Sequence, residues 1–202
     1  MQEDPYLPGM PEKKRRLLLA AIDVFAEQGF HATTIDQIAE RAGVGKGTVY
    51  LYFQSKQDLF LGIIQEGLGW LIQFAARLAE AEPDPKERLS KLAHWHLRVI
   101  LQNYPRMRMF MSGGVPQDLH ALLPEFQRRL LDYRSLYVNA LEAGVKAGSL
   151  RAHDCRLVAT GLLGYLNQVG RYLAEETKSA DLDTAAHEVL QFIFSGIEKV
   201  GN

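Results

Sequence analysis

The segment 43–48, Gly-Val-Gly-Lys-Gly-Thr, carries the residue types of a phosphate-binding loop. A P-loop requires a glycine, four further residues and then Gly-Lys-Ser/Thr, because its backbone amides must wrap the phosphates while the hydroxyl reaches the metal ion. Here Gly47 follows Lys46, and the residue five positions before Gly45 is Glu40. The dinucleotide pattern GxGxxG is also absent. Its last glycine is replaced by Thr48 if the pattern starts at Gly43, and by Tyr50 if it starts at Gly45. The spacing argues against nucleotide binding and leaves another kind of phosphate open.

The other residues that could support catalysis or metal binding are isolated. His94 and His96 are two positions apart, which separates them by about 200° on a helix, so they do not form a metal-binding pair. His153 and Cys155 have no further ligands nearby in sequence, and no activating partner for the cysteine is evident. Neither GxSxG nor HExxH occurs. We therefore expect no enzymatic activity, no cofactor and no metal.

Composition indicates an ordinary soluble chain without a global basic field. The 202 residues are 47% hydrophobic, and 23 Lys and Arg oppose 24 Asp and Glu, for a formal net charge of -1. Binding to a polyanion must therefore come from a local patch. One cysteine, no secretory signal pattern and no long uninterrupted apolar stretch predict a cytoplasmic protein without membrane association.

The elements that would position the 43–48 segment are helices. Leu18, Ile22 and Phe25 recur at helical spacing between Pro11, which suits a helix N1 position, and Gly29, which suits a helix end. Strand and hairpin signals are scarce. We predict an all-α fold of about nine helices, which beyond residue 55 include a long helix ending before Pro83-Asp84-Pro85 and helices at 86–103, 105–111, 125–147, 154–176 and 183–198.

Residues 33–53 have the pattern of a helix-turn-helix. Thr33 or Thr34 can cap a short helix, and a second short helix is predicted at 46–53. Ala39, Gly43 and Val49 are spaced so that a small residue allows close helix approach, a glycine ends the first helix at positive φ, and a valine fills the angle between the helices. The second helix would present Lys46, Gly47 and Thr48 at its N-terminus, where anions such as DNA phosphates bind.

Four cations, Lys13, Lys14, Arg15 and Arg16, occupy the first turns of the first helix, where the helix dipole disfavours positive charge. This placement suggests either a nearby polyanion or a solvated helix start.

The run AAIDVFAEQGFHATTIDQIAERAGVGKGTVYLYFQSKQDLF within residues 15–60 resembles the DNA-binding domain of the TetR family of transcriptional repressors. The resemblance rests on Phe25, Gly29, Phe30, Thr33-Thr34, Ile38-Ala39, Ala42-Gly43-Val44, the block 47–53, Lys56 and Leu59. It implies a DNA-binding domain at 1–55 and an effector-binding and dimerisation domain at 56–202. His31 and Asp36 occupy positions that vary in the family, so base preference does not transfer, and an Asp36 that faced a phosphate would repel it.

The resemblance also implies a dimer in which the helix at 46–53 enters the major groove of operator DNA. The implied contacts are Thr34 and Thr48 to phosphates, Tyr50, Tyr52 and Lys56 to the backbone, Lys46 and Gly47 to bases or backbone, with Thr33 as a further contact residue.

The last two predicted helices are candidates for the dimer interface. Apolar residues recur along both at helical spacing, and Gly161 and Gly164 would allow close approach of another helix. The same stripe would also suit a monomer core. The candidate interface residues are Val158, Leu162, Tyr165, Val169, Val189, Phe192 and Ile193.

The middle helices are expected to enclose a small-molecule effector that is apolar or amphipathic. Large apolar residues with a few polar tips are typical of such pockets, although each of them alone would equally suit core packing. Arg106 and Arg108 suit either the anionic head of a fatty acid or acyl-CoA or a solvated basic face. The candidate lining residues are Trp95, Val99, Met107, Phe110, Met111, Leu130, Tyr133, Tyr137, Leu163 and Asn167.

The sequence therefore predicts a ligand-responsive regulator, a repressor that leaves its palindromic operator when the effector binds. The alternative is a helical ligand-binding or adaptor protein without specific DNA binding.

Overall fold

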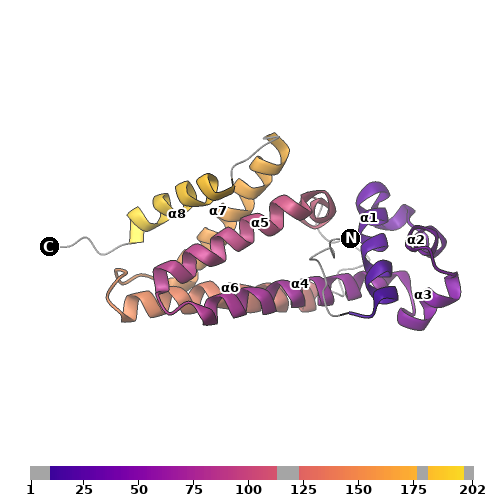
Figure 1. Cartoon of the computed structure of the whole chain (residues 1–202), viewed down its shortest axis with the longest axis horizontal. Coiled ribbons are helices and arrows are strands. Elements are labelled where there is room, and N and C mark those ends of the chain that lie inside the picture. Colours follow the sequence, from indigo (N-terminus) through magenta and orange to yellow (C-terminus); the bar gives the residue numbers. More distant parts are fainter. Residues whose placement is uncertain (1–9, 113–122, 177–181, 198–202) are drawn as a thin grey trace. The chain divides into compact units, whose positions relative to one another are not determined.

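The computed structural model describes residues 10–112, 123–176 and 182–197, and these residues form helices and connecting turns without a β-strand. The predicted all-α fold is confirmed. The eight helices are α1 (Glu12–Ala32), α2 (Ile35–Ala42), α3 (Lys46–Tyr52), α4 (Lys56–Ala81), α5 (Pro85–Ser112), α6 (Leu123–Lys146), α7 (Cys155–Glu176) and α8 (Leu182–Ile197) (Figure 1).

The predicted helices at 86–103 and 105–111 are one helix, α5. A proline inside a helix removes a backbone hydrogen bond and crowds the preceding turn, which is why a break was predicted before Pro105. The turn before the proline is held by other contacts: Tyr104 is buried and its hydroxyl donates to the carboxylate of Glu175. Tertiary packing therefore overrides the local signal.

Contacts divide the chain into a first unit, Met1–Leu71 with Pro105–Leu130, and a second unit, Ile72–Tyr104 with Leu131–Asn202. This is a division of packing, and the functional boundary at residue 55 stays a prediction. In the first unit α1, α2, α3 and the start of α4 share one core. Phe25, Phe30 and Phe60 lie at its centre, with Phe60 meeting both other rings at steep angles, at centroid distances of 5.8 and 5.5 Å. Such edge-on pairs add to the stabilisation that apolar burial provides.

Local capping fixes the start and end of the short helices. The Thr34 hydroxyl accepts from the backbone N–H of Gln37, and the Gln37 side chain accepts from the N–H of Thr34, which completes a capping box at the start of α2. Gly43 ends α2 at φ 64°, the left-handed conformation that the sequence predicts. Gly29 leaves helical geometry at φ 81°, so regular helix in α1 stops there as expected.

α4 is the one helix in the described part of the chain with the length and composition to cross a membrane. Its residues Leu59, Phe60, Ile63 and Ile64 are buried in the core of the first unit. The apolar character of α4 is thus used in protein packing.

Candidate nucleic-acid interface and effector site

The helix α3, predicted to enter the DNA groove, is anchored in the core by two side chains and leaves most of the others exposed. Val49 is fully buried and Phe53, just after the helix, is 5% exposed. Tyr50 is 49% exposed, Tyr52 is 37% exposed and Leu51 is 82% exposed. An exposed leucine costs free energy in water, so a surface that could cover it is favoured. Leu51 is not among the predicted contacts, although its position two residues from both Val49 and Phe53 places it on the opposite side of the helix from these core residues.

Lys46, Gly47 and Thr48 open the same helix. Lys46 and Gly47 are exposed and Thr48 is half-buried. A Cβ added at Gly47 would meet nothing within 4 Å, so this glycine leaves the backbone open to an approaching molecule. The segment 43–48 thus forms the turn and first residues of an exposed helix.

Thr33 is placed differently from the prediction. It is 1% exposed, its hydroxyl donates to the carbonyl of Gly29 at 2.7 Å, and it accepts a hydrogen bond from Gln28. A buried and satisfied hydroxyl is poorly placed to bind a phosphate, so we leave Thr33 out of the proposed DNA contacts. Its neighbour Thr34 is exposed, and its hydroxyl takes part in the capping box.

Lys56 also has a different role from the predicted backbone contact. Its ammonium donates to the carbonyls of Phe30 at 2.7 Å, His31 at 3.2 Å and Thr33 at 2.8 Å, and it lies 4.5 Å from the centre of the Phe30 ring. These carbonyls belong to the end of α1, where unpaired carbonyl groups attract cations. All three donors of the ammonium are engaged within the protein, so Lys56 joins the start of α4 to the end of α1.

The cations at the start of α1 are mostly paired inside the protein. Lys14 forms an ion pair with Glu66 of α4, Arg15 one with Glu12, and Arg16 donates to the carbonyls of Ala42 and Gly43 at the end of α2. Their crowding therefore has a structural reason. Of the two alternatives left open by the sequence, a nearby polyanion is not required to explain them.

Lys46 forms an ion pair with Asp36, a residue of the first turn of α2. The ammonium lies 2.9 Å from the carboxylate, and the two side chains are 54% and 65% exposed. The hydrogen bond and the charge of Asp36 raise the pKa of Lys46. Asp36, which would repel a phosphate that it faced, is thus directed at Lys46, the one cation of α3.

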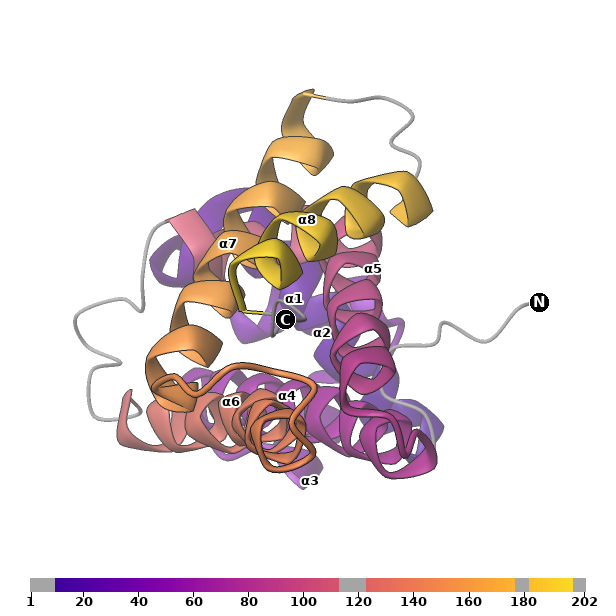
Figure 2. The same cartoon turned by 90° about the vertical axis from the view of Figure 1, so that its left-hand side faces the viewer.

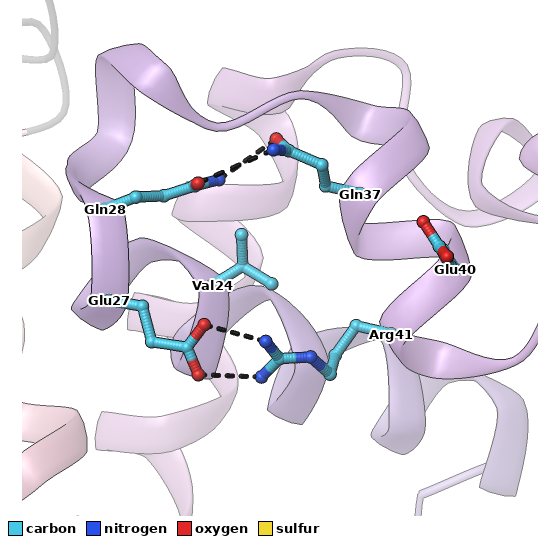
Figure 3. Close-up of a pocket in the computed structure, with 6 residues that line it drawn as sticks. All are labelled: Val24, Glu27, Gln28, Gln37, Glu40 and Arg41. Atoms are coloured by element: carbon cyan, nitrogen blue, oxygen red, sulfur yellow. Dashed lines mark hydrogen bonds and ion pairs between the residues drawn. The ribbon is translucent and has the colours of Figure 1, made fainter.

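A polar clamp holds α1 to α2 around a shallow depression of about 300 Å³ (Figure 3). Arg41 donates to both carboxylate oxygens of Glu27 at 2.9 and 2.7 Å, and Gln28 donates to Gln37 at 3.0 Å. Two parallel bonds fix orientation as well as distance. The clamp therefore sets the angle of α2 against α1.

In the second unit, the candidate pocket residues Tyr133, Tyr137 and Asn167 form a polar chain with His96 that connects α5, α6 and α7; its histidine and tyrosines are buried, and Asn167 is exposed. The Tyr137 hydroxyl donates to the carbonyl of Leu92 at 2.9 Å and lies 3.4 Å from the Tyr133 hydroxyl. His96 Nδ1 lies 3.1 Å from the Tyr133 hydroxyl, and His96 Nε2 lies 3.3 Å from Asn167 Oδ1. An amide oxygen only accepts, so the neutral imidazole carries its proton on Nε2 and accepts the Tyr133 proton on Nδ1.

Burial controls the ionisation of this chain. It lowers the pKa of His96 to about 4, and the hydrogen bond to Asn167 only partly opposes that shift. Burial likewise raises the pKa of Tyr133 and of Tyr137. At neutral pH the chain is therefore uncharged, as a polar group in an apolar core should be.

The other candidate pocket residues differ in their surroundings. Val99 is buried, Leu163 is half-buried, and the Trp95 ring stacks on Phe74 with centroids 4.0 Å apart. Leu130 is exposed. The side chains of Met107, Phe110 and Met111, like those of Arg106 and Arg108, lie outside the described residues.

Two of the predicted interface residues belong to the monomer core. Leu162 and Val189 are each 4% exposed, so their side chains are buried within the subunit and we leave them out of the proposed interface. Val158, Val169 and Ile193 are half-buried. α7 and α8 lie side by side (Figure 2), and Tyr165 of α7 packs on Phe192 of α8 with 5.7 Å between ring centroids. The exposed large apolar residues of these two helices are Leu157, Tyr165, Tyr172 and Phe192.

Comparison with known families decides what kind of protein carries this site. The family described as bacterial regulatory proteins, tetR family, matches residues 17–63, and the tetracyclin repressor-like C-terminal domain matches residues 82–192. The second match alone covers more than half of the chain. The chain belongs to the TetR family. The predicted DNA-binding, ligand-responsive transcriptional regulator is thereby confirmed.

Curated transcriptional regulators match nearly the whole chain. The fatty acid metabolism regulator protein of Bacillus subtilis is 25% identical over 186 residues, covering 92% of this chain and 95% of the relative. The HTH-type transcriptional activator FasR of Mycolicibacterium smegmatis is 26% identical over 190 residues, covering 94% and 84%.

Solved TetR-family structures share the fold. The fatty acid degradation regulator FadR from Bacillus halodurans matches with a TM-score of 0.79 at 26% identity, covering 90% of this chain and 98% of that one. FadR from Bacillus subtilis in complex with stearoyl-CoA matches with a TM-score of 0.79 at 24% identity, covering 91% and 99%.

Proposed function

We propose that this TetR-family regulator is a cytoplasmic repressor that binds a palindromic operator as a dimer and leaves it on binding an acyl effector, either a fatty acid or an acyl-CoA. The observation that carries the DNA-binding part is the exposed face of α3. Two side chains seat the helix in the core, while tyrosine, leucine and lysine side chains remain outside. A helix of this kind fits the major groove, where apolar groups meet thymine methyls and lysine meets guanine acceptors.

The proposed contacts divide by chemistry. Thr34, Thr48 and Tyr52 are proposed to reach phosphates, which fix register without reading sequence. Lys46, Tyr50 and Leu51 are proposed to face base edges, with the Gly47 backbone close by. Lys56 is not included, because its ammonium is engaged at the end of α1.

The dimer is proposed to form through the exposed apolar residues of α7 and α8. Leu157 of α7 is 70% exposed and Phe192 of α8 is 69% exposed. Gly161 and Gly164, also on α7, have open space where a side chain would be. Open glycines let another helix approach closely. A two-fold pair of recognition helices would then match a two-fold operator.

The acyl effector is supported by the relatives and by the chemistry of the second unit. One solved relative is a complex with stearoyl-CoA. In this chain Val99 and Leu163 offer apolar contact, while Tyr133, His96 and Asn167 offer hydrogen-bonding groups on the same three helices. An apolar chain with a polar head suits such a lining. Binding would lower operator affinity by favouring a conformer with wrongly spaced recognition helices.

Stearoyl-CoA should raise the melting temperature of the protein and release it from bound DNA. Stearic acid tests the free acid, and coenzyme A alone is the matched control, which should do neither. Thermal unfolding and fluorescence anisotropy of a labelled duplex selected by the protein measure the two effects. If no acyl compound shifts the melting temperature, the effector class is wrong, and a compound that shifts it without releasing DNA is not an inducer.

A further inference from the structure

The recognition helix carries a single charged side chain, and that charge is already matched. α3 has the sequence KGTVYLY, so Lys46 is its only ionised group at neutral pH. Its ammonium is bonded to Asp36 across the turn that joins α2 to α3. Both side chains are more than half exposed, and an exposed pair contributes little to folding stability. The ion pair therefore calls for a reason other than stability.

The position of Asp36 makes it a durable partner. It lies in the first turn of α2, where the helix dipole stabilises a carboxylate. The other cations around the helix-turn-helix are engaged elsewhere: Arg16 at the carbonyls of Ala42 and Gly43, Arg41 at Glu27, and Lys56 at the end of α1. Asp36 thus neutralises Lys46, whereas the other cations around the helix-turn-helix have partners elsewhere.

We propose that Asp36 determines specificity by cancelling the charge of Lys46 and fixing the direction of its remaining hydrogen-bond donors. This inference rests on the proposed DNA-binding function. A lysine ammonium has three donors, and one bond to Asp36 leaves two for a base acceptor such as guanine O6 or N7. A cation that stays paired displaces no counterion from DNA, so it adds little to binding of random sequence. Asp36 therefore shifts the contribution of Lys46 from general attraction to recognition.

The test compares Asp36→Asn with Glu40→Gln, a matched control that removes the same charge from another exposed position of α2. The probes are a duplex selected by the full-length protein and a scrambled duplex of the same length and composition. Asp36→Asn should steepen the slope of log affinity against log salt by about one and raise affinity for the scrambled duplex by about eightfold at 0.1 M salt. The ratio of selected to scrambled affinity should fall. Glu40→Gln should change neither by as much.

A second comparison asks whether the pair persists on DNA. Lys46→Ala should weaken binding to the selected duplex without lowering the salt slope in the wild-type background, and should lower the slope by about one in the Asp36→Asn background. Equal slope changes in both backgrounds, or Asp36→Asn behaving as Glu40→Gln, would overturn the inference. Failure of the wild-type protein to prefer the selected duplex would instead overturn the proposed function.

Discussion

Replacing Lys56 with methionine should lower the free energy of unfolding by about 3 kcal/mol, because three carbonyls at the end of α1 lose a charged donor. A hydrogen bond to a charged group contributes about 1.5–3 kcal/mol, and partial exposure of this site keeps the total below the sum of three such bonds. Methionine keeps much of the apolar stem over the Phe30 ring while removing the donors. Chemical denaturation of the full-length protein measures the loss.

Lys13→Met is the matched control, since Lys13 is exposed and lies at the start of α1. It should change stability by less than about 0.5 kcal/mol. At temperatures where the Lys56→Met protein is folded, its DNA binding should keep the wild-type salt slope. A stable Lys56→Met variant whose slope falls by about one would instead show Lys56 to be a phosphate contact.

Acidification should destabilise the protein by about 3 kcal/mol between pH 7 and pH 4 through His96 alone. The folded protein holds His96 with a pKa of about 4, whereas an unfolded chain has the ordinary value near 6.5. Between these values the unfolded state binds a proton that the folded state does not, so the free energy of unfolding falls as pH falls. Above the pKa of the unfolded chain neither state binds this proton, so the contribution of His96 to the free energy of unfolding is constant there.

His96→Gln should remove this component, so that its stability curve is flatter than the wild-type curve in the same pH window. The variant loses some stability at every pH through the altered bonds to Tyr133 and Asn167. The slope of the free energy of unfolding against pH is unaffected by that constant loss and reports the protonation of His96. Imidazole NMR resonances of wild type and His96→Gln assign the titration directly. Parallel stability curves, or an imidazole of His96 that titrates near 6.5, would contradict the buried neutral histidine.

The helix-turn-helix could be predicted from the sequence because its determinants are local. Ala39, Gly43 and Val49 are within eleven positions of one another, and the backbone angle and burial found at each are those that the spacing requires. The capping residue Thr34 is likewise recognised from its immediate neighbours. Short-range geometry of this kind leaves few alternatives.

The roles of Thr33 and Lys56 could not be predicted, because each side chain donates to a backbone carbonyl, at Gly29 in the preceding turn for Thr33 and at the distant end of α1 for Lys56. Lys56 bonds to carbonyls 23 to 26 positions earlier in the chain. From the sequence alone, Thr33 is only a polar residue and Lys56 only a cation, both close to the predicted DNA-contacting helix. Backbone carbonyls, which carry no sequence signal, are the partners in both cases.

The second unit shows the same limit for apolar residues. Periodicity on α7 marks an apolar helix, but it does not distinguish Leu162, buried among its own helices, from Tyr165, which faces outward. His96 and Tyr133 are 37 positions apart, so their hydrogen bond became visible only in the fold. The sequence could name the residues of the candidate effector pocket, and the structure shows which of them are hydrogen-bonded to one another.

Selection of duplexes from a random-sequence library by the full-length protein tests whether this regulator binds a two-fold operator sequence-specifically. We expect enrichment of a palindrome whose half-sites are separated by about 34–36 Å or a multiple of one helical turn, with affinity that falls as salt rises. Recovery of no sequence above the starting library, at any salt concentration, would contradict it.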